Sequence, residues 1–280
     1  AGGGVRGDRG ARGVRPLAGM RELVLVRGAG DVATAVAIRL WERGLAVVCT
    51  ELSRPLALRR AVAFAEAVYE GRWAVEGHEA ARAVSPQEAL RLLGKGIIPV
   101  LAPEGDAVER LRPEAIVDAR MAKRNLGTRI DEAPLVVGLG PGFTAGVDCH
   151  AAVETLRGPF LGKVYLEGSP LAPTHIPCEI GGLSRERVLR AKRPGHFIGY
   201  KAIGERVKKG ESLARCSGEE LRAPCSGVVR GILRSGIKVP AGTKAVEIDP
   251  RGDPQVCFRV ADRSWRIAAG VLEALGILGL

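Results

Sequence analysis

Aromatic side chains are scarce in this sequence and make up 4% of its 280 residues. Single-stranded nucleic acids bind largely by stacking their bases on such side chains, so nucleic acid is an unlikely partner on this count. No apolar run reaches the roughly 18 residues that a membrane span needs. The first residues also lack the apolar core of a signal peptide. We therefore expect a cytoplasmic protein that does not bind a membrane.

Paired cysteines are missing as well. The six cysteines are scattered, and no two of them have the Cys-x-x-Cys spacing that is typical of zinc and redox sites. We therefore predict no metal site. Hydrophobic residues make up 46% of the chain and charged residues 26%, as in globular proteins. The net charge of +11 favours acidic partners, among them phosphorylated cofactors, without choosing between them.

The order of sequence patterns predicts an α/β fold in five segments. Residues 1–19 are rich in Gly and Arg and form a disordered leader, and residues 20–146 form a Rossmann-like nucleotide- or cofactor-binding domain. Residues 147–187 are expected to form a β-hairpin and a connection. Residues 188–250 are expected to form a small β domain, and residues 251–280 to carry a C-terminal helix.

A glycine-rich turn is the feature around which the first domain is organised. The apolar run Leu23–Val26 predicts a buried strand before the turn, and a helical pattern extends after it to Arg43. Gly28, Gly30 and Ala33 stand where a dinucleotide-binding fold needs a tight turn, close approach of a pyrophosphate and close helix packing. We predict that they bind a cofactor; a tight turn without a ligand is the alternative.

Acidic and basic residues near this turn qualify the prediction. Glu51 ends the second predicted strand, 51 − 28 = 23 residues after Gly28, near the spacing of about 20 for a carboxylate that binds ribose hydroxyls. Asp31 suits the start of a helix but would repel an adjacent phosphate. Arg59 and Arg60 are expected on a following helix, where they contact an adenosine phosphate or are simply solvated.

More candidate cofactor-binding residues follow the fourth and fifth predicted strands. Asp118, Arg120 and Lys123 come after the strand at 115–118, and Arg124 adds positive charge. Asp118 either binds a ligand or pairs with Arg120.

A second glycine-rich loop follows the predicted strand at 135–137 and supplies four further candidates: Gly138, Gly140, Gly142 and Thr144. This loop either holds an anion or forms a strained crossover. Since the carboxyl ends of parallel strands share one edge, we predict that Gly30, Asp118 and Gly140 face a common crevice.

An alternating pattern from 147 to 154 places Asp148, His150 and Glu154 on one face of a predicted hairpin. Such side chains could bind a metal or transfer protons, and a solvated hairpin face is the alternative.

The predicted small β domain contains an internal repeat. The pattern Gly204-x-x-Val207-x-x-Gly210 recurs 32 residues later, at 236, 239 and 242. Two similar halves resemble the barrel-sandwich fold of biotinyl and lipoyl domains. Those domains carry a modified lysine before an Ala-Pro pair, but residues 216–227 contain no lysine. We therefore expect a module that docks or packs, and not a swinging-arm carrier.

Four stretches together resemble the YqeB family, which comprises accessory proteins of selenium-dependent molybdenum hydroxylases. They are residues 27–34, 64–71, 117–123 and 138–146. The resemblance implies a maturation protein that binds a nucleotide or a molybdopterin-type phosphorylated cofactor and assists delivery of cofactor or selenium to a molybdenum hydroxylase client.

The resemblance carries over no catalytic residue, and residues 173–178 depart from the glycine-containing pattern expected there. The alternative function is an NAD(P)-dependent oxidoreductase that uses Glu51, and a pure scaffold is a third.

Overall fold

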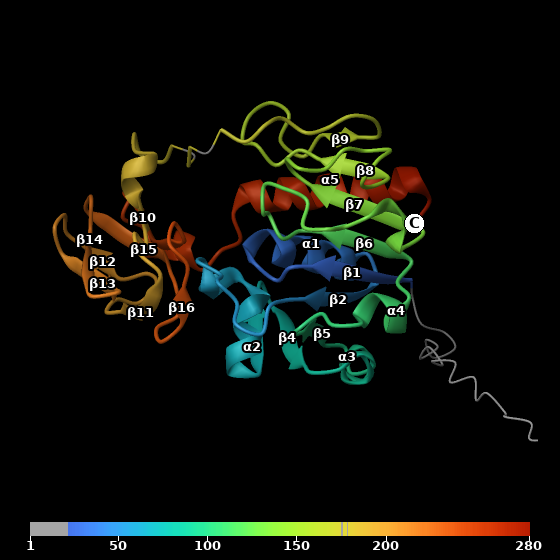
Figure 1. Cartoon of the computed structure of the whole chain (residues 1–280), viewed down its shortest axis with the longest axis horizontal. Coiled ribbons are helices and arrows are strands. Elements are labelled where there is room, and N and C mark those ends of the chain that lie inside the picture. Colours follow the sequence, from blue (N-terminus) through green and yellow to red (C-terminus); the bar gives the residue numbers. More distant parts are fainter. Residues whose placement is uncertain (1–21, 175, 178) are drawn as a thin grey trace, which may run out of the picture.

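The computed structural model describes residues 22–174, 176–177 and 179–280. The predicted leader, His175 and Cys178 lie outside these residues. The described chain forms a large lobe built on one broad sheet and a small lobe built on two smaller sheets, and they lie side by side (Figure 1).

A nine-stranded mixed sheet forms the large lobe, in the order β3-β4-β5-β2-β1-β6-β7-β8-β9. The strands at the two ends of this order, β3 and β9, run antiparallel to their neighbours, and those between run parallel. The bounds are Leu23–Arg27 (β1), Ala46–Thr50 (β2), Arg72–Val75 (β3), His78–Ala83 (β4), Ile98–Leu101 (β5), Ala115–Asp118 (β6), Leu135–Leu139 (β7), Ala151–Val153 (β8) and Val164–Tyr165 (β9).

Helices cover both faces of this sheet. Helix α1 (Asp31–Glu42) packs on one face together with α5 (Asp262–Leu278), which brings the end of the chain back to the large lobe as expected. Helices α3 (Pro86–Leu93) and α4 (Ala107–Leu111) pack on the other face. Because both faces are covered, the central strands are mostly apolar, and all five residues of β1 are buried.

The start of α3 follows from its sequence. Ser85 Oγ accepts a hydrogen bond from Glu88 N at 3.2 Å, and Glu88 Oε2 accepts one from Val84 N at 2.9 Å. Pro86 occupies the first turn, where no backbone N–H is needed. Ser85 is therefore the N-cap of α3, and Glu88 reaches back to the residue before the cap.

The small lobe contains two four-stranded antiparallel sheets, β10-β17-β15-β12 and β14-β13-β11-β16. Phe197, Leu213 and Ile232 are among the fully buried residues between them. The bounds are Val188–Arg190 (β10), Gly195–Gly199 (β11), Arg206–Val207 (β12), Ser212–Cys216 (β13), Glu219–Arg222 (β14), Gly227–Ile232 (β15), Lys238–Val239 (β16) and Lys244–Asp249 (β17).

The predicted fold, a Rossmann-like parallel sheet with a biotinyl/lipoyl-like barrel-sandwich domain, is wrong. The large sheet is mixed, because the hairpins β3–β4 and β8–β9 reverse the chain at its two ends. The glycine turn predicts only the strand–helix–strand unit that contains it. It does not predict the direction of the strands at the two ends of the sheet. In the small lobe, the two copies of the repeat form β12 and β16, which lie in different sheets.

Other elements differ from expectation as well. The residues around Arg59 and Arg60 form no α-helix; a single 3-10 turn covers Arg60–Val62. The alternating stretch from 147 to 154 contributes only the short strand β8. No helix in the described part of the chain is long and apolar enough to cross a membrane. The cytoplasmic location stays a prediction.

Two glycines of the second loop provide a matched test of its packing. Gly142 and Gly146 both have positive φ, +101° and +83°, which costs an alanine about 1 kcal/mol. A Cβ at Gly142 would also collide with the backbone of Arg124 and Asn125, whereas Gly146 has open space. We expect Gly142→Ala to lower the urea midpoint clearly more than Gly146→Ala; equal shifts would contradict the packing described here.

Candidate functional site

The loops that carry the predicted site residues lie at one edge of the large sheet. In the sheet register Arg27 is aligned with Asp118, and Asp118 with Gly138. The loops after β1, β6 and β7 therefore leave the sheet side by side, on the edge that faces the small lobe (Figure 1). Gly30, Asp118 and Gly140 follow or end these strands. A role of these residues in binding stays a prediction.

The first glycine turn is closed by side chains of the chain itself. Glu51 Oε2 accepts a hydrogen bond from Ala29 N at 3.0 Å, and Glu51 Oε1 accepts one from Leu52 N at 2.8 Å. Asp31, in the first turn of α1, forms an ion pair with Arg59 at 3.3 Å. The amide and the helix terminus that a diphosphate would use thus already face two carboxylates. Ala33 is fully buried beneath the turn.

Burial raises the pKa of the Glu51 carboxyl, although the two backbone N–H groups that it accepts act in the opposite direction. A raised pKa means that the folded protein holds the charged form of Glu51 at a cost. The carboxylate therefore remains available for protonation at a higher pH than an ordinary glutamate.

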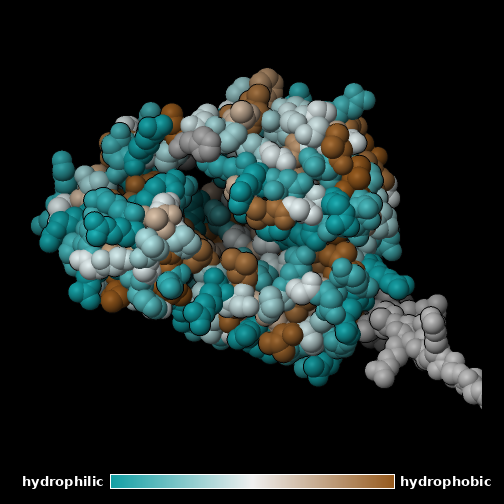
Figure 2. Space-filling model, in the orientation of Figure 1, coloured by the Kyte–Doolittle hydropathy of each residue, from teal (hydrophilic) through white to brown (hydrophobic). Residues whose placement is uncertain are grey.

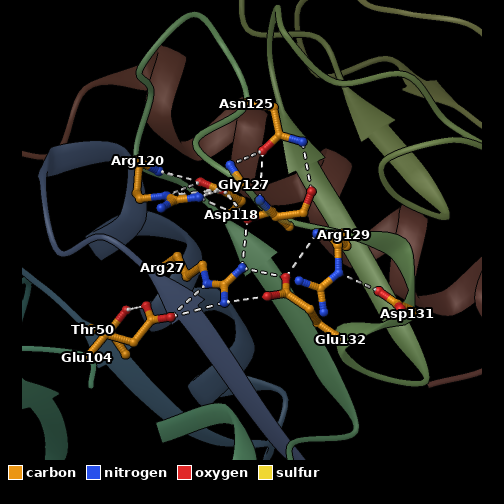
Figure 3. A network of polar contacts seen from close by, with 11 residues as sticks. Arg27, Thr50, Glu104, Asp118, Arg120, Asn125, Gly127, Arg129, Asp131 and Glu132 are labelled. Carbon is orange, nitrogen blue, oxygen red and sulfur yellow. Dashed lines mark hydrogen bonds and ion pairs between the residues drawn. The ribbon is translucent and has the colours of Figure 1, made fainter. Parts of the chain in front are cut away.

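A buried network of charges lies at the ends of β1, β2 and β6 (Figure 3). Arg27, which is 5% exposed, donates from Nη1 to Thr128 Oγ1 at 2.7 Å and to Glu132 Oε2 at 2.7 Å. Its Nε donates to Glu104 Oε1 at 3.0 Å, and Glu104 Oε2 accepts from Thr50 Oγ1 at 2.7 Å. Two carboxylates thus surround one guanidinium, which satisfies its charge without a ligand.

Asp118 lies in the same network and is 2% exposed. It accepts hydrogen bonds from the Arg120 guanidinium and, at 2.8 Å, from Thr128 Oγ1. Of the two roles that the sequence left open for Asp118, the structure shows the pairing with Arg120. The positive charge of Arg120 is consequently paired with Asp118, at the end of β6.

The glycines of the second loop serve close packing. A Cβ at Gly138 would collide with the ring of Phe143, and one at Gly140 with Thr155. Thr144 N donates to Asp148 Oδ2 at 2.9 Å, and the hydroxyls of Thr144 and Ser169 are 2.9 Å apart. These contacts are those of the crossover that the sequence allowed as an alternative to an anion site.

The three polar residues of the predicted hairpin face do not converge. Asp148 caps Thr144 N, His150 Nδ1 accepts from Val136 N at 3.0 Å, and the buried Glu154 accepts from backbone amides, among them Leu171 N at 2.8 Å. No group of three or more His, Cys, Asp or Glu side chains that could hold a metal ion occurs within the described residues.

A cluster of cations faces the same edge from two lobes, and sequence reasoning found only part of it. Lys123 belongs to the loop after β6, while Lys244 and Arg190 are aligned with each other on β17 and β10. Desolvation lowers the pKa of Lys244, and the charges of Arg190, Lys123 and Arg59 lower it further, against the carboxylate of Glu247. Lys244 and Arg190 were missed because only the pairing of distant strands brings them here.

No protein-family model matches the chain. YqeB of Escherichia coli strain K12, described as an uncharacterized protein, is 44% identical over 258 residues, which are 92% of this chain. Over these residues the chain is similar to YqeB. It spans 48%, about half, of the length of that relative.

Solved structures that resemble the chain include a succinylglutamate desuccinylase from Silicibacter sp. TM1040, with 13% identity and a TM-score of 0.25 over 82% of this chain and 85% of the other. A succinylglutamate desuccinylase/aspartoacylase from Rhodobacter sphaeroides has 16% identity and a TM-score of 0.25, over 82% and 85%. At these scores neither structure defines the fold or the activity of this chain.

The function predicted from the sequence needs correction. We expected a maturation protein that binds a nucleotide or molybdopterin-type cofactor at the glycine turn, or else an NAD(P)-dependent oxidoreductase that uses Glu51. Both depend on an open turn, and in the structure Glu51 itself accepts the hydrogen bond from Ala29 N.

The raised pKa of Glu51 leads to a pH-dependent prediction. In the folded protein Glu51 keeps its proton to a higher pH than in the unfolded chain, so its contribution to stability falls as pH rises from about 4.5 through the folded pKa. We expect Glu51→Gln to gain stability relative to the unmodified protein over this rise, as measured by melting temperatures at pH 4.5 and pH 7. A difference that shrinks or stays constant would contradict the assignment.

Proposed function

We propose that this chain binds a phosphate-bearing small molecule in the crevice between its two lobes. The crevice lies between the carboxyl edge of the large sheet and strands β10 and β17 of the small lobe. Figure 2 shows the surface hollowed between the two lobes. Ligands of open α/β sheets bind outside the carboxyl ends of the strands, and interfaces between lobes are common ligand sites.

The observation that carries this proposal is the direct alignment of two cations. Arg190 and Lys244 are cross-strand partners on the antiparallel pair β10–β17. Like charges placed directly opposite each other destabilise a sheet. Arg190 donates to the Gly242 carbonyl at 2.6 Å, but no ion pair of either side chain occurs among the described residues. A bound anion would relieve this repulsion.

Lys123 extends the positive charge from the opposite lobe. Its φ is +62°, and that of Met121 in the same loop is +56°. Two non-glycine residues in the left-handed region are costly, and such strain is concentrated at functional sites. Lys123 is exposed and makes no hydrogen bond or ion pair within the described part of the chain. The positive charge of Lys123 is one of those that lower the pKa of Lys244.

The nearest carboxylate is already neutralised. Glu247 is buried and forms ion pairs with Arg187 at 2.7 Å and with Arg59 at 3.3 Å. Burial alone would raise its pKa, but the charges of Arg59, Arg187 and Arg230 lower the pKa of Glu247 to about 2. Glu247 therefore mainly balances the arginines, and it offsets the positive charge around Lys244 only in part. A phosphate, with several charged acceptor oxygens, suits such a site.

The loops of Gly28 and Asp118, which the sequence predicted to bind a cofactor, do not contact the ligand in this proposal but support the loop of Lys123. The loops of Gly28 and Asp118 are in contact, since a Cβ at Gly28 would lie 3.2 Å from Ala119 O, and they form the wall behind Lys123. A molybdenum hydroxylase as the partner of this chain stays a prediction, and its test is a pull-down of that enzyme with the chain as bait.

Alanine variants of the two lysines test the proposal. We expect Lys123→Ala and Lys244→Ala each to weaken the binding of inorganic pyrophosphate about tenfold, because a hydrogen bond to a charged group contributes ~1.5–3 kcal/mol. The measurement is isothermal titration calorimetry at low ionic strength. The controls are Lys95→Ala and Lys208→Ala, which remove exposed lysines from the large and the small lobe. Equal affinities for all four variants, or no binding to the unmodified protein, would refute the proposal.

A second prediction separates binding from folding. Because the pKa of Lys244 is lowered in the folded state, its charge costs stability at neutral pH. This cost is relieved as pH rises from the folded pKa towards the ordinary value of 10.5. We expect Lys244→Gln to raise the melting temperature of the free protein at pH 7 while it reduces the stabilisation by pyrophosphate. A lower melting temperature of the free variant would count against the cation cluster.

A further inference from the structure

A separate pocket lies where the two lobes touch. Its volume is about 440 Å³, within the range of ~300–1,000 Å³ that is typical of small-molecule sites. The large lobe contributes Arg54, from the loop after β2, and Tyr69, from α2 (Ala67–Glu70). The small lobe contributes residues of β11 and of the turn between β15 and β16: His196, Arg234, Ser235 and Ile237. None of these belongs to the cation cluster of the crevice.

One wall of the pocket is rigid and flat. The Arg234 guanidinium lies 4.6 Å from the centroid of the Tyr69 ring, and the Tyr69 hydroxyl donates to the Pro55 carbonyl at 2.8 Å. Arg234 also forms ion pairs with Glu66 and, at 2.6 Å, with Glu70. Because these carboxylates hold it, Arg234 is fixed as part of the wall. The Tyr69 ring and Ile237 give the pocket its apolar surface, beside the flat guanidinium of Arg234.

The charge that remains in the pocket belongs to Arg54. This side chain is exposed and makes no ion pair or hydrogen bond within the described residues, whereas the charge of Arg234 is balanced by Glu66 and Glu70. Ser235 Oγ accepts from Gly199 N at 3.1 Å, so its O–H remains able to donate. A guanidinium and a hydroxyl donor beside an apolar wall match a carboxylate attached to a small planar body.

We propose that this pocket between the lobes binds a small organic carboxylate, with the carboxylate on Arg54 and Ser235 and the apolar body against Tyr69 and Ile237. The proposal does not rest on the phosphate site of the crevice, since it uses different residues. A ligand held in this way would contact both lobes at once.

Benzoate is the probe for the test, and benzamide is its uncharged match. We expect benzoate to bind the full chain with a dissociation constant on the order of 1 mM, as suits a ligand of this size, and to shift the amide NMR signals of Ser235 and Gly236. Benzamide should bind at least about fivefold more weakly, because the Arg54 guanidinium recognises a charge.

Variants locate the binding site. Arg54→Ala should abolish saturable benzoate binding, and Arg54→Lys should leave a weaker remainder because an ammonium lacks the two-pronged fit of a guanidinium. Arg82→Ala removes another exposed arginine of the large lobe and should change nothing, and neither should Lys123→Ala. No saturable binding to the unmodified protein, equal binding of benzamide, or unchanged affinity in Arg54→Ala would each overturn the proposal.

Discussion

The segment between β2 and α2 attaches the small lobe to the large one, and the geometry of both sites depends on it. Leu58 O accepts a hydrogen bond from Ile232 N at 3.0 Å, and Arg60 Nε donates to Ile232 O at 2.8 Å. Arg59, between them, forms ion pairs with Asp31 of α1 and with Glu247 of β17. One short stretch therefore links the start of α1 to the core of the small lobe. The crevice and the pocket are the spaces that this attachment leaves.

Two kinds of charge meet at the carboxyl edge of the large sheet. The network around Arg27 and Asp118 is buried, and carboxylates pair with both of its guanidinium groups, so it supports the loops and leaves no positive charge for a ligand. Breaking such a network by removing one member leaves a buried charge without a partner, which is costly. Lys123 and Lys244 are different, because neither side chain forms an ion pair within the described residues, although the charge of Glu247 acts on Lys244. This contrast is why the lysines, and not the buried pairs, carry the proposed function.

Local patterns predicted local structure well. The apolar runs before Gly28 and before Arg120 form β1 and β6, the N-cap Ser85 begins α3, and the C-terminal pattern forms α5. These elements depend on residues close together in sequence. The hairpin β3–β4 was missed because β3 is a short edge strand, and only Val75 among its four residues is buried.

The sequence by itself determined the strand–turn–helix unit at Gly28, the edge on which the loops emerge, and the similarity to YqeB. Only the tertiary structure decided what those loops do. Glu51 turns back on the glycine loop, Arg120 turns back on Asp118, and Lys244 is brought opposite Arg190 by the pairing of β17 with β10. The sequence shows which residue types are present and how far apart they stand along the chain. Whether a charge is free or already paired depends on side chains that are distant in sequence, and these meet only after the sheets have formed.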